Sequence, residues 1–257
     1  MAFLAAPAPA GLFALDVGQG DAILVRAPNG ADVLIDTGPP GGASGRAFAE
    51  NSPSDRAIGL VALTHQDLDH SGGAKDILGH FSVGQLAAPV WSEKATPILD
   101  EAARRGVATA TLQRGDRVWL DRETPVYLDI LWPPPRTPVG DGNDGSMVTR
   151  LVYGSSSAIL TGDAPRGVEK ILVAAADPLD ADILKAGHHG SKTSSAPEFV
   201  AAVSPTYAIV SAGKDNRYGH PNKETLATLA AGKVQVLSTV EMGTAAFIWD
   251  GHALSLP

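Results

Sequence analysis

One short stretch of this chain concentrates side chains suited to holding metal ions. Leu63-Thr64-His65-Gln66-Asp67-Leu68-Asp69-His70-Ser71-Gly72-Gly73 places two imidazoles and two carboxylates directly after an apolar run. Burying so many ionisable groups is costly, because each charge loses its hydration. One or two divalent cations would offset that cost, so the pattern predicts a metal site. The alternative, a solvated turn with an aspartate cap, does not explain both histidines.

Two aspartates at the ends of predicted strands are expected to join this site. Asp163 follows an apolar run and Gly162, and a carboxylate there can bridge two metals. Taken alone, it would be an ordinary turn aspartate. Asp36 ends another strand, in Ile35-Asp36-Thr37-Gly38, and we assign it the role of orienting a ligand.

The remaining histidines divide into a pair, a single uncertain residue and two isolated residues. His188 and His189 follow a further apolar run, so one can ligate while the other meets substrate or moves a proton. Surface histidines in a loop are the alternative. His220, in Asn216-Arg217-Tyr218-Gly219-His220-Pro221, fits a site or a turn equally well. His80 and His252 have no companions and are expected to be structural.

Composition limits the classes of function. The 257 residues, 44% of them hydrophobic, suit one soluble domain over residues 1–257, with residues 1–11 expected to be flexible. A net charge of −8 argues against a general basic nucleic-acid binder, although bound dications would reverse the field locally. The absence of cysteine excludes thiolate metal sites. No apolar run reaches the roughly 18 residues of a membrane span, and the start is a poor signal peptide.

Other catalytic motifs are missing. The turn Gly18-Gln19-Gly20-Asp21 lacks the third glycine of a dinucleotide fingerprint. The chain has no GxxxxGK[ST] phosphate loop and no Gly-x-Ser-x-Gly elbow for a serine hydrolase. These absences leave the metal site as the leading hypothesis.

Hydrophobic periodicity predicts hairpins early in the chain and alternating strands and helices later. The proline-rich and glycine-rich stretch over 133–145 is interpreted as a loop over the site. This order predicts two sheets covered by helices on their outer faces. The predicted strands are 12–17, 22–26, 32–36, 59–64, 83–88, 117–120, 126–131, 147–153, 157–161, 181–186, 207–212, 235–239 and 244–249. The predicted helices are 46–55, 72–79, 96–105, 166–176, 197–203 and 223–231.

Together these motifs resemble the metallo-β-lactamase superfamily, whose second motif is His-x-His-x-Asp-His. Here that motif reads His65-x-Asp67-x-Asp69-His70. More narrowly, the chain is similar to the metallo-hydrolase domain of bacterial competence DNA-uptake channel proteins (ComEC type). The matching segments, in the expected order, are 15–21, 34–38, 65–73, 160–163, 182–191 and 216–221.

The resemblance implies a four-layer αββα sandwich and a centre of two divalent metal ions. It implies His65 and Asp67 at site one, and Asp69, His70 and His188 at site two, with Asp163 bridging. The histidine of the superfamily's third motif has no counterpart, so Asn143 or Ser146 is expected to face the site instead. An oxygen-rich site one favours Mn²⁺ or Mg²⁺ there over Zn²⁺, and Mn²⁺ is the expected metal.

The resemblance implies a metal-dependent phosphodiesterase that cleaves DNA and degrades the strand that is not imported during natural transformation. The expected catalytic residues are Asp69 or His189 for the proton and His220 for the leaving group. Residues expected to support ligands or contact substrate are Asp36, Asn143, Ser146, Lys185, Ser191, Lys192 and Arg217. The expected partners are DNA and the membrane channel of a longer protein, which would place the domain on the extracytoplasmic face of the cell membrane.

Two alternatives remain open. One is a hydrolase of a smaller phosphodiester or a lactone on the same scaffold, because a fold does not determine a substrate. The other is a DNA-binding module whose catalytic site has decayed.

Overall fold

A computed structural model gives the structure of the protein and describes residues 9–41, 43, 45, 48, 57–135, 140 and 142–257. Most of the helix predicted over 46–55 and most of the flexible start predicted over 1–11 lie outside these residues. None of the described helices is both long and apolar enough to cross a lipid bilayer.

The first sheet contains the early hairpins. Among the described residues it has eight strands in the order β15-β14-β1-β2-β3-β4-β5-β6. Strands β3 to β6 run parallel to one another. Each neighbouring pair in the rest of the sheet, from β15 through β14, β1 and β2 to β3, is antiparallel. The bounds are β1 Gly11–Ala14, β2 Ile23–Arg26, β3 Asp32–Ile35, β4 Ala57–Ala62, β5 Ser82–Ala88, β6 Ala108–Thr111, β14 Ala245–Trp249 and β15 Leu254–Ser255.

The second sheet contains the later alternating part. Its described strands lie in the order β13-β12-β11-β10-β9-β8-β7, parallel from β13 to β10 and antiparallel from β10 to β7. The bounds are β7 Arg117–Asp121, β8 Val126–Trp132, β9 Val148–Tyr153, β10 Ser156–Leu160, β11 Ile183–Lys185, β12 Tyr207–Val210 and β13 Gln235–Ser238.

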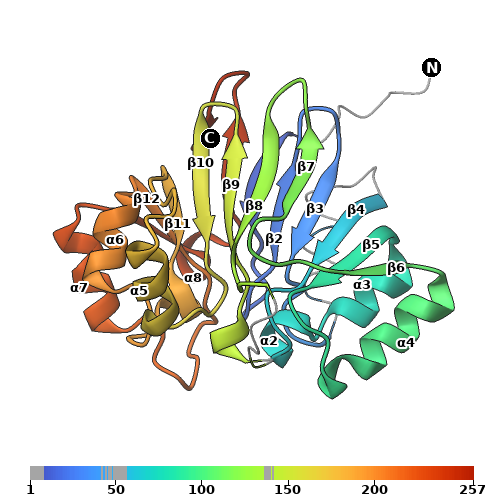
Figure 1. Ribbon diagram of the computed structural model, residues 1–257. Coiled ribbons are helices and arrows are strands. Elements are labelled where there is room, and N and C mark those ends of the chain that lie inside the picture. Colours follow the sequence, from blue (N-terminus) through green and yellow to red (C-terminus); the bar gives the residue numbers. More distant parts are fainter. Residues whose placement is uncertain are drawn as a thin grey trace.

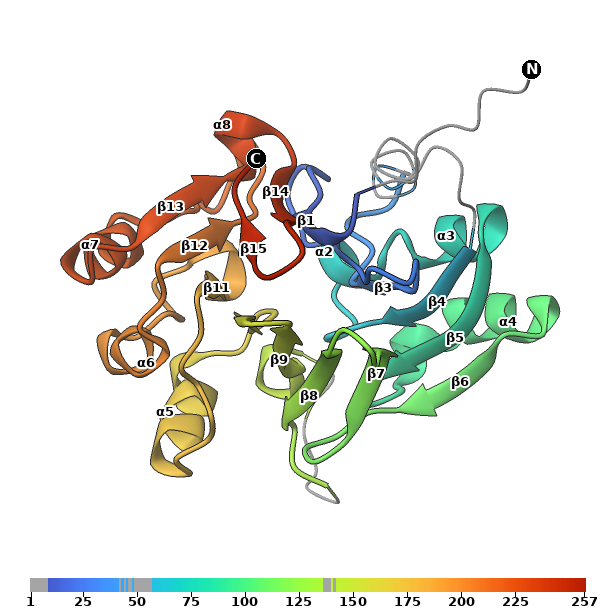
Figure 2. The ribbon, with the colours of Figure 1, turned by 90° about the horizontal axis from the view of Figure 1, so that it is seen from above.

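Helices cover the outer face of each sheet, as Figures 1 and 2 show. Helices α3 and α4 lie against the first sheet, and α5, α6 and α7 lie against the second. The structure is therefore the predicted αββα sandwich. The helix bounds are α2 Leu68–Ser71, α3 Ala74–His80, α4 Thr96–Arg105, α5 Arg166–Ala174, α6 Pro197–Val203, α7 Lys223–Ala231 and α8 Thr239–Met242. Short 3₁₀ turns occupy Glu93–Ala95 (η1), Asn143–Gly145 (η2) and Gly187–Gly190 (η3).

Side-chain alternation along the strands builds three apolar layers. In β2, Ile23 and Val25 pack between the two sheets with Phe247, while Leu24 packs toward the helical side with Ile77. Residues two apart share one face of a strand, so a continuous apolar strand can serve both layers. A third layer lies between the second sheet and α5 to α7.

The strand ends carry the polar segments to a common edge of the sandwich. His65 lies three residues beyond β4, Asp163 three beyond β10, and His188 three beyond β11. Asp36 follows β3 directly. In Figure 1, α2 lies at this lower edge, between the two halves of the molecule.

Candidate metal centre

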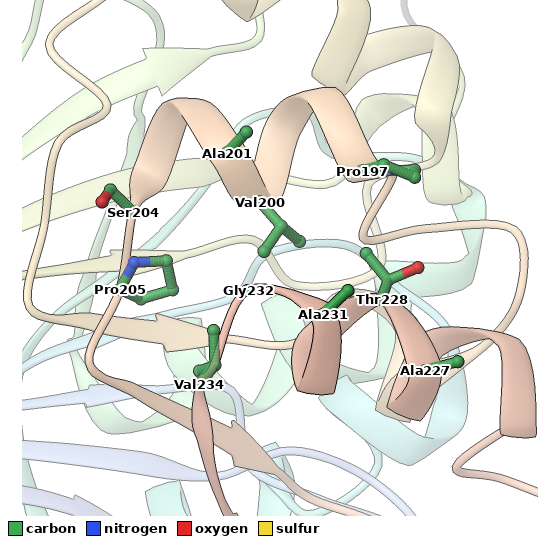
Figure 3. Close-up of a pocket in the computed structure, with 10 residues that line it drawn as sticks. All are labelled: Pro197, Val200, Ala201, Ser204, Pro205, Ala227, Thr228, Ala231, Gly232 and Val234. Carbon is green, nitrogen blue, oxygen red and sulfur yellow. The ribbon is translucent and has the colours of Figure 1, made fainter.

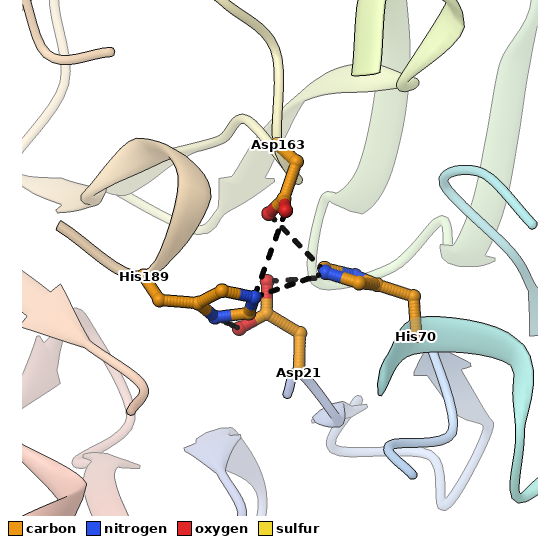
Figure 4. Close-up of side chains that lie close together, drawn as sticks. All are labelled: Asp21, His70, Asp163 and His189. Carbon is orange, nitrogen blue, oxygen red and sulfur yellow. Dashed lines mark hydrogen bonds and ion pairs between the residues drawn. The ribbon is translucent and has the colours of Figure 1, made fainter. Parts of the chain in front are cut away.

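Four buried side chains from separate parts of the chain converge at this edge. They are Asp21 from the β1–β2 loop, His70 from α2, Asp163 after β10 and His189 after β11 (Figure 4). One potential ligand atom from each lies within 4.8 Å of all the others. His70 Nε2 is 3.2 Å from both His189 Nε2 and Asp163 Oδ1. Such a set can hold a divalent cation.

The imidazoles are oriented through their Nδ1 atoms. His70 Nδ1 donates to Asp36 Oδ2 at 2.7 Å, and His189 Nδ1 donates to the Ser211 carbonyl at 2.9 Å. Both rings therefore direct Nε2 toward the centre, where this nitrogen can bind a metal once its proton is displaced.

His65 is oriented in the same way through a hydroxyl relay. The Thr64 hydroxyl donates to Asp36 Oδ2 at 2.7 Å, so it must accept from His65 Nδ1, 3.0 Å away. His65 Nε2 is buried and has no hydrogen-bond partner among the described residues, and Asp67 Oδ2 lies 3.7 Å from it. A buried nitrogen without a partner is costly. A bound metal would satisfy it, so the residues present fit a metal centre.

Charge around the centre perturbs its ionisation. Burial alone would lower the pKa of His189, but Asp163 and Asp21 outweigh it and raise the pKa to about 9. Likewise, Asp163 and Asp36 raise the pKa of buried His70 well above its usual value. The carboxyl of Asp163 responds in the opposite sense, because His70 and His189 overcome its burial and hold its pKa well below the ordinary value. The centre thus carries an excess of negative charge that protons or cations offset.

Unusual backbone conformations position several of these residues. Asp36, His188 and His189 have φ of 59°, 50° and 55°, left-handed values that are unfavourable for side chains with a Cβ. Such strain persists only where the surrounding structure enforces it, and it is concentrated at functional sites. Gly20 has φ of 139°, and a Cβ there would lie 2.1 Å from the Asp69 carbonyl oxygen. A glycine is therefore needed for the Asp21 loop to pack against α2.

The mouth of the centre contains the more exposed members of the set. Asp67 is 45% exposed and its carboxylate is 3.5 Å from Lys94 Nζ. Asp69 is 33% exposed, with Oδ2 at 3.3 Å from His189 Nε2. His188 is 27% exposed, with Nε2 at 3.5 Å from Asp163 Oδ2. Its Nδ1 lies 3.3 Å from the Asn143 amide nitrogen, which can only donate, so the ring proton belongs on Nε2.

His220 lies beside the pair of histidines. Its ring centroid is 5.5 Å from that of His188 and 6.3 Å from that of His189. Burial, together with the charges of those two rings, lowers the pKa of His220 to about 4. The ring is therefore neutral at pH 7, with one N–H to donate.

Lys185 and Ser146 support the carboxylates from behind. The fully buried ammonium of Lys185 pairs with Asp21 and donates to the Gly162 carbonyl at 3.0 Å. The Ser146 hydroxyl accepts from the Asp163 backbone nitrogen at 2.9 Å, so it positions that aspartate.

The sequence of this chain matches a known protein family. Residues 15–214 match the model of the metallo-beta-lactamase superfamily. The chain belongs to this superfamily. The match spans the strand ends that carry His65, Asp163 and His189.

Curated members of the superfamily with related sequences include two proteins from bacteria. ComE operon protein 3 of Bacillus subtilis is 35% identical over 250 residues, which cover 90% of this chain and 32% of that protein. Competence protein ComA of Neisseria gonorrhoeae is 32% identical over 234 residues, covering 90% of this chain and 31% of that protein. The chain therefore spans about a third of the length of these relatives.

Solved structures share the fold at low sequence identity. The metallo-beta-lactamase fold protein YhfI of Bacillus subtilis superposes with a TM-score of 0.61 at 11% identity. The superposition covers 93% of this chain and 99% of that one. It confirms the predicted sandwich.

The sequence analysis does not identify one of the four clustered side chains. Asp21 lies in the cluster of four, although Gly18-Gln19-Gly20-Asp21 was interpreted only as a turn. The signal available was that this turn, like the others that supply ligands, follows a strand. The sequence analysis predicts His188 as the ligand of this histidine pair. In the structure His189 lies in the cluster of four, and His188 lies at its rim.

The residues expected to contact phosphate lie around the mouth. The hydroxyl of buried Ser191 bonds that of Thr193 at 2.9 Å, and the Thr193 hydroxyl is 3.2 Å from His188 Nδ1. Lys192 is exposed, and its backbone nitrogen donates to Asn222. Arg217 is exposed and bonds its neighbour Tyr218. Their contact with a substrate remains a prediction.

A separate groove between α6 and α7 does not contribute to the centre. It has a volume of about 560 Å³ and is lined mostly by small and apolar side chains, among them Val200, Ala227 and Val234 (Figure 3). None of its ten lining residues is ionisable. Catalytic chemistry is therefore assigned to the strand-end centre.

Proposed function

We propose that this chain is a metal-dependent phosphodiesterase that cleaves DNA. The observation that supports this most directly is that His70 and His189 direct Nε2 toward the Asp163 carboxylate, while neighbouring His65 has a buried Nε2 with no hydrogen-bond partner among the described residues. Their Nδ1 atoms are all engaged by acceptors. A decayed site would have no physical reason to keep this arrangement and its strained backbone.

We assign two divalent cations to this centre, with Mn²⁺ as the expected metal and Zn²⁺ or Mg²⁺ as alternatives. His65 and Asp67 would hold one, and Asp69, His70 and His189 the other, with Asp163 shared. We give the ligand role to His189 because its Nε2 lies in the cluster of four and its Nδ1 bonds a carbonyl, whereas His188 lies at the rim with its proton on Nε2. Bound dications would activate water and neutralise the charge of a phosphodiester.

The remaining residues act around the reacting phosphate. His188 is placed at the rim to donate a hydrogen bond from Nε2–H to a substrate oxygen, and neutral His220 to donate a hydrogen bond to the leaving-group oxygen. Asp69, partly open to solvent, can accept a proton from an attacking water. Lys192 and Arg217, both exposed beside this mouth, supply positive charge for phosphates further along a strand.

The names of the relatives support the proposal of a role in DNA uptake. ComA is named as a competence protein, and this chain matches about a third of its length. We propose that the chain degrades the strand that is not imported, beside the membrane channel of a longer protein and on the extracytoplasmic face of the cell membrane.

The test is a nuclease assay on defined single-stranded and double-stranded oligonucleotides with added Mn²⁺. Asp69→Ala is expected to abolish cleavage while leaving the melting temperature close to that of the unaltered protein. His80→Ala is the matched control, because His80 lies at the exposed end of α3 and should leave cleavage unchanged. Full activity of Asp69→Ala would contradict the assignment, and cleavage of only small esters would replace DNA as the substrate.

A further inference from the structure

An exposed aromatic ring lies beside the candidate centre, and the chemistry proposed so far gives it no role. Tyr218 is 51% exposed, and it is the single aromatic residue among the large exposed apolar side chains of the described chain. Exposing so much apolar ring area is unfavourable without a partner. The ring lies two residues from His220, whose own ring contacts both His188 and His189.

The ring is aligned with His220. The centroids of Tyr218 and His220 are 5.6 Å apart, and the two planes are nearly parallel at 22°. The stack therefore leads outward from the centre, from His188 and His189 through His220 to Tyr218. On Tyr218 the Arg217 guanidinium lies 4.9 Å from the ring centroid and donates to the phenol oxygen at 2.8 Å.

The loop that carries Tyr218 is held in a fixed shape. The Asn216 side chain accepts from the backbone nitrogens of Tyr218 and His220, at 3.2 and 3.0 Å, and donates to the carbonyls of Gly213 and His220. Asn222 then ties the loop to the segment after His189, accepting from Lys192 N at 2.8 Å and donating to Gly190 O through its backbone. The exposed ring is thus presented in one position before any ligand arrives, which lowers the entropy cost of binding.

The charge of this loop suits a nucleic acid. The loop between β12 and α7, residues 211–222, contains Lys214 and Arg217 against one acidic residue, Asp215, in a chain whose net charge is −8. Positive charge beside an exposed aromatic ring is the combination with which proteins bind single-stranded nucleic acid, through phosphate contacts and base stacking.

We infer that Tyr218 is a stacking platform for the nucleobase of the nucleoside next to the scissile phosphate. This inference rests on the proposed phosphodiesterase function and deepens it. A base on this ring would hold its own phosphate at the mouth formed by Asp69, His188 and His220. The exposed guanidinium of Arg217 is free to shift from the ring face to a phosphate. The site would thereby favour nucleoside diesters with an unpaired base over simple alkyl diesters.

The test compares three diesters that share one leaving group, so that contacts of the leaving group cancel. They are thymidine 5′-(p-nitrophenyl phosphate), thymidine 3′-(p-nitrophenyl phosphate) and methyl p-nitrophenyl phosphate, each assayed with Mn²⁺. Base stacking on an aromatic side chain contributes roughly 1–3 kcal/mol, so we expect kcat/KM for one thymidine ester to exceed that for the methyl ester by roughly 5- to 150-fold.

Tyr218→Ala should remove most of this preference, mainly through KM, and leave turnover of the methyl ester unchanged. Tyr218→Phe and Tyr218→Trp should keep it, because each retains an aromatic face. Tyr127→Ala is the matched control. Tyr127 also stacks against an arginine, with Arg117 at 4.0 Å from its centroid, but it lies near the end of β8 remote from the centre.

Each outcome separates the two ideas. If all three esters are hydrolysed and Tyr218→Ala keeps the thymidine preference, the platform is wrong and the phosphodiesterase stands. If Tyr218→Ala slows all three esters equally, the ring acts on the leaving group or on folding, and the platform is again wrong. If no diester is hydrolysed by the unaltered protein, the proposed function fails, and the platform fails with it.

Discussion

Replacing Asp36 with asparagine should weaken metal binding by changing the proton positions on the histidines that Asp36 orients. Asp36 accepts three hydrogen bonds, from the Thr64 backbone nitrogen, the Thr64 hydroxyl and His70 Nδ1, each at 2.7 Å. Its φ of 59° is one that asparagine tolerates well, so Asp36→Asn introduces no new backbone strain. Asparagine also keeps the size of the side chain.

The consequence follows from the hydrogen-bond chemistry of the amide. In Asp36→Asn the amide oxygen would replace Oδ1 and keep accepting from Thr64 N, which leaves the NH₂ group facing His70 Nδ1. That NH₂ group can only donate, so His70 Nδ1 becomes an acceptor and its ring proton moves to Nε2. The Thr64 hydroxyl, which donated to Oδ2, must also turn to accept from the NH₂ group and donate to His65 Nδ1. To bind a metal through Nε2, His70 must move its proton back to Nδ1. This breaks the new hydrogen bond and leaves the Nδ1–H group facing the NH₂ group of the asparagine.

The expected cost is that of one hydrogen bond to a charged group, about 1.5–3 kcal/mol. This corresponds to roughly a 10- to 150-fold higher Kd for Mn²⁺, measured by isothermal titration calorimetry. The melting temperature of the metal-free protein should change little, because the altered pair remains hydrogen-bonded. A matched control is Asp32→Asn at the other end of β3, which disturbs the buried ion pair with Arg26. It should lower stability and leave Mn²⁺ affinity intact.

The reasoning would be refuted by Asp36→Asn binding Mn²⁺ within twofold of the unaltered protein. Long-range nitrogen–proton NMR spectra of the His70 ring provide a second, independent check. They should report Nδ1–H in the unaltered protein at high pH and Nε2–H in the variant.

Three further measurements test the centre and its supports. The pKa of His189 is raised to about 9, and that of His70 also lies above its usual value, so a metal must displace protons from these rings below pH 9. Mn²⁺ affinity should therefore rise by at least about tenfold from pH 6 to pH 8. Gly20→Ala would place a Cβ against the Asp69 carbonyl and should cost about 1–3 kcal/mol of unfolding free energy in urea, with weaker Mn²⁺ binding. Burial raises the pKa of Glu169 to about 7 from 4.5, so the free energy of unfolding should fall as pH rises through this window, and Glu169→Gln should remove that fall.

Much of the fold could be predicted from local sequence signals. The helices predicted over 96–105, 197–203 and 223–231 match α4, α6 and α7 at both ends. Two of them have proline near the first turn, and Gly106 ends α4 in a left-handed conformation, which are strong boundary signals. Such signals are local, so tertiary contacts do not override them.

Other elements were not predictable for physical reasons. Strand β6, Ala108–Thr111, alternates alanine with threonine at a sheet edge, and four small, mostly exposed residues give too weak a hydrophobic pattern to predict a strand. Helix α2 begins at Leu68, before the glycine pair that was expected to open the helix. Its single turn gives no periodicity, and its position depends on the packing of the Asp21 loop against Asp69.

The candidate site could be predicted only in part from the sequence, because its side chains come from segments that lie far apart in the chain. His65, Asp67, Asp69 and His70 are neighbours in sequence and were identified together. Asp21 was missed because nothing within its own turn distinguishes an aspartate of the centre from an ordinary turn aspartate. Its partner Lys185 was named only through the family resemblance, although a lysine ending an apolar strand already suggests a buried counter-ion.

The placement of Lys185 accounts for how the centre can exist with and without metal. Three buried carboxylates, Asp21, Asp36 and Asp163, face this one buried ammonium, which leaves two negative charges in a region of low dielectric. Without metal, the raised pKa values of His70 and His189 supply two protons that offset them. One dication carries the same charge and can take the place of those protons. Asp67 and Asp69, at the partly exposed mouth, provide two further negative charges, which is the charge needed to hold a second dication.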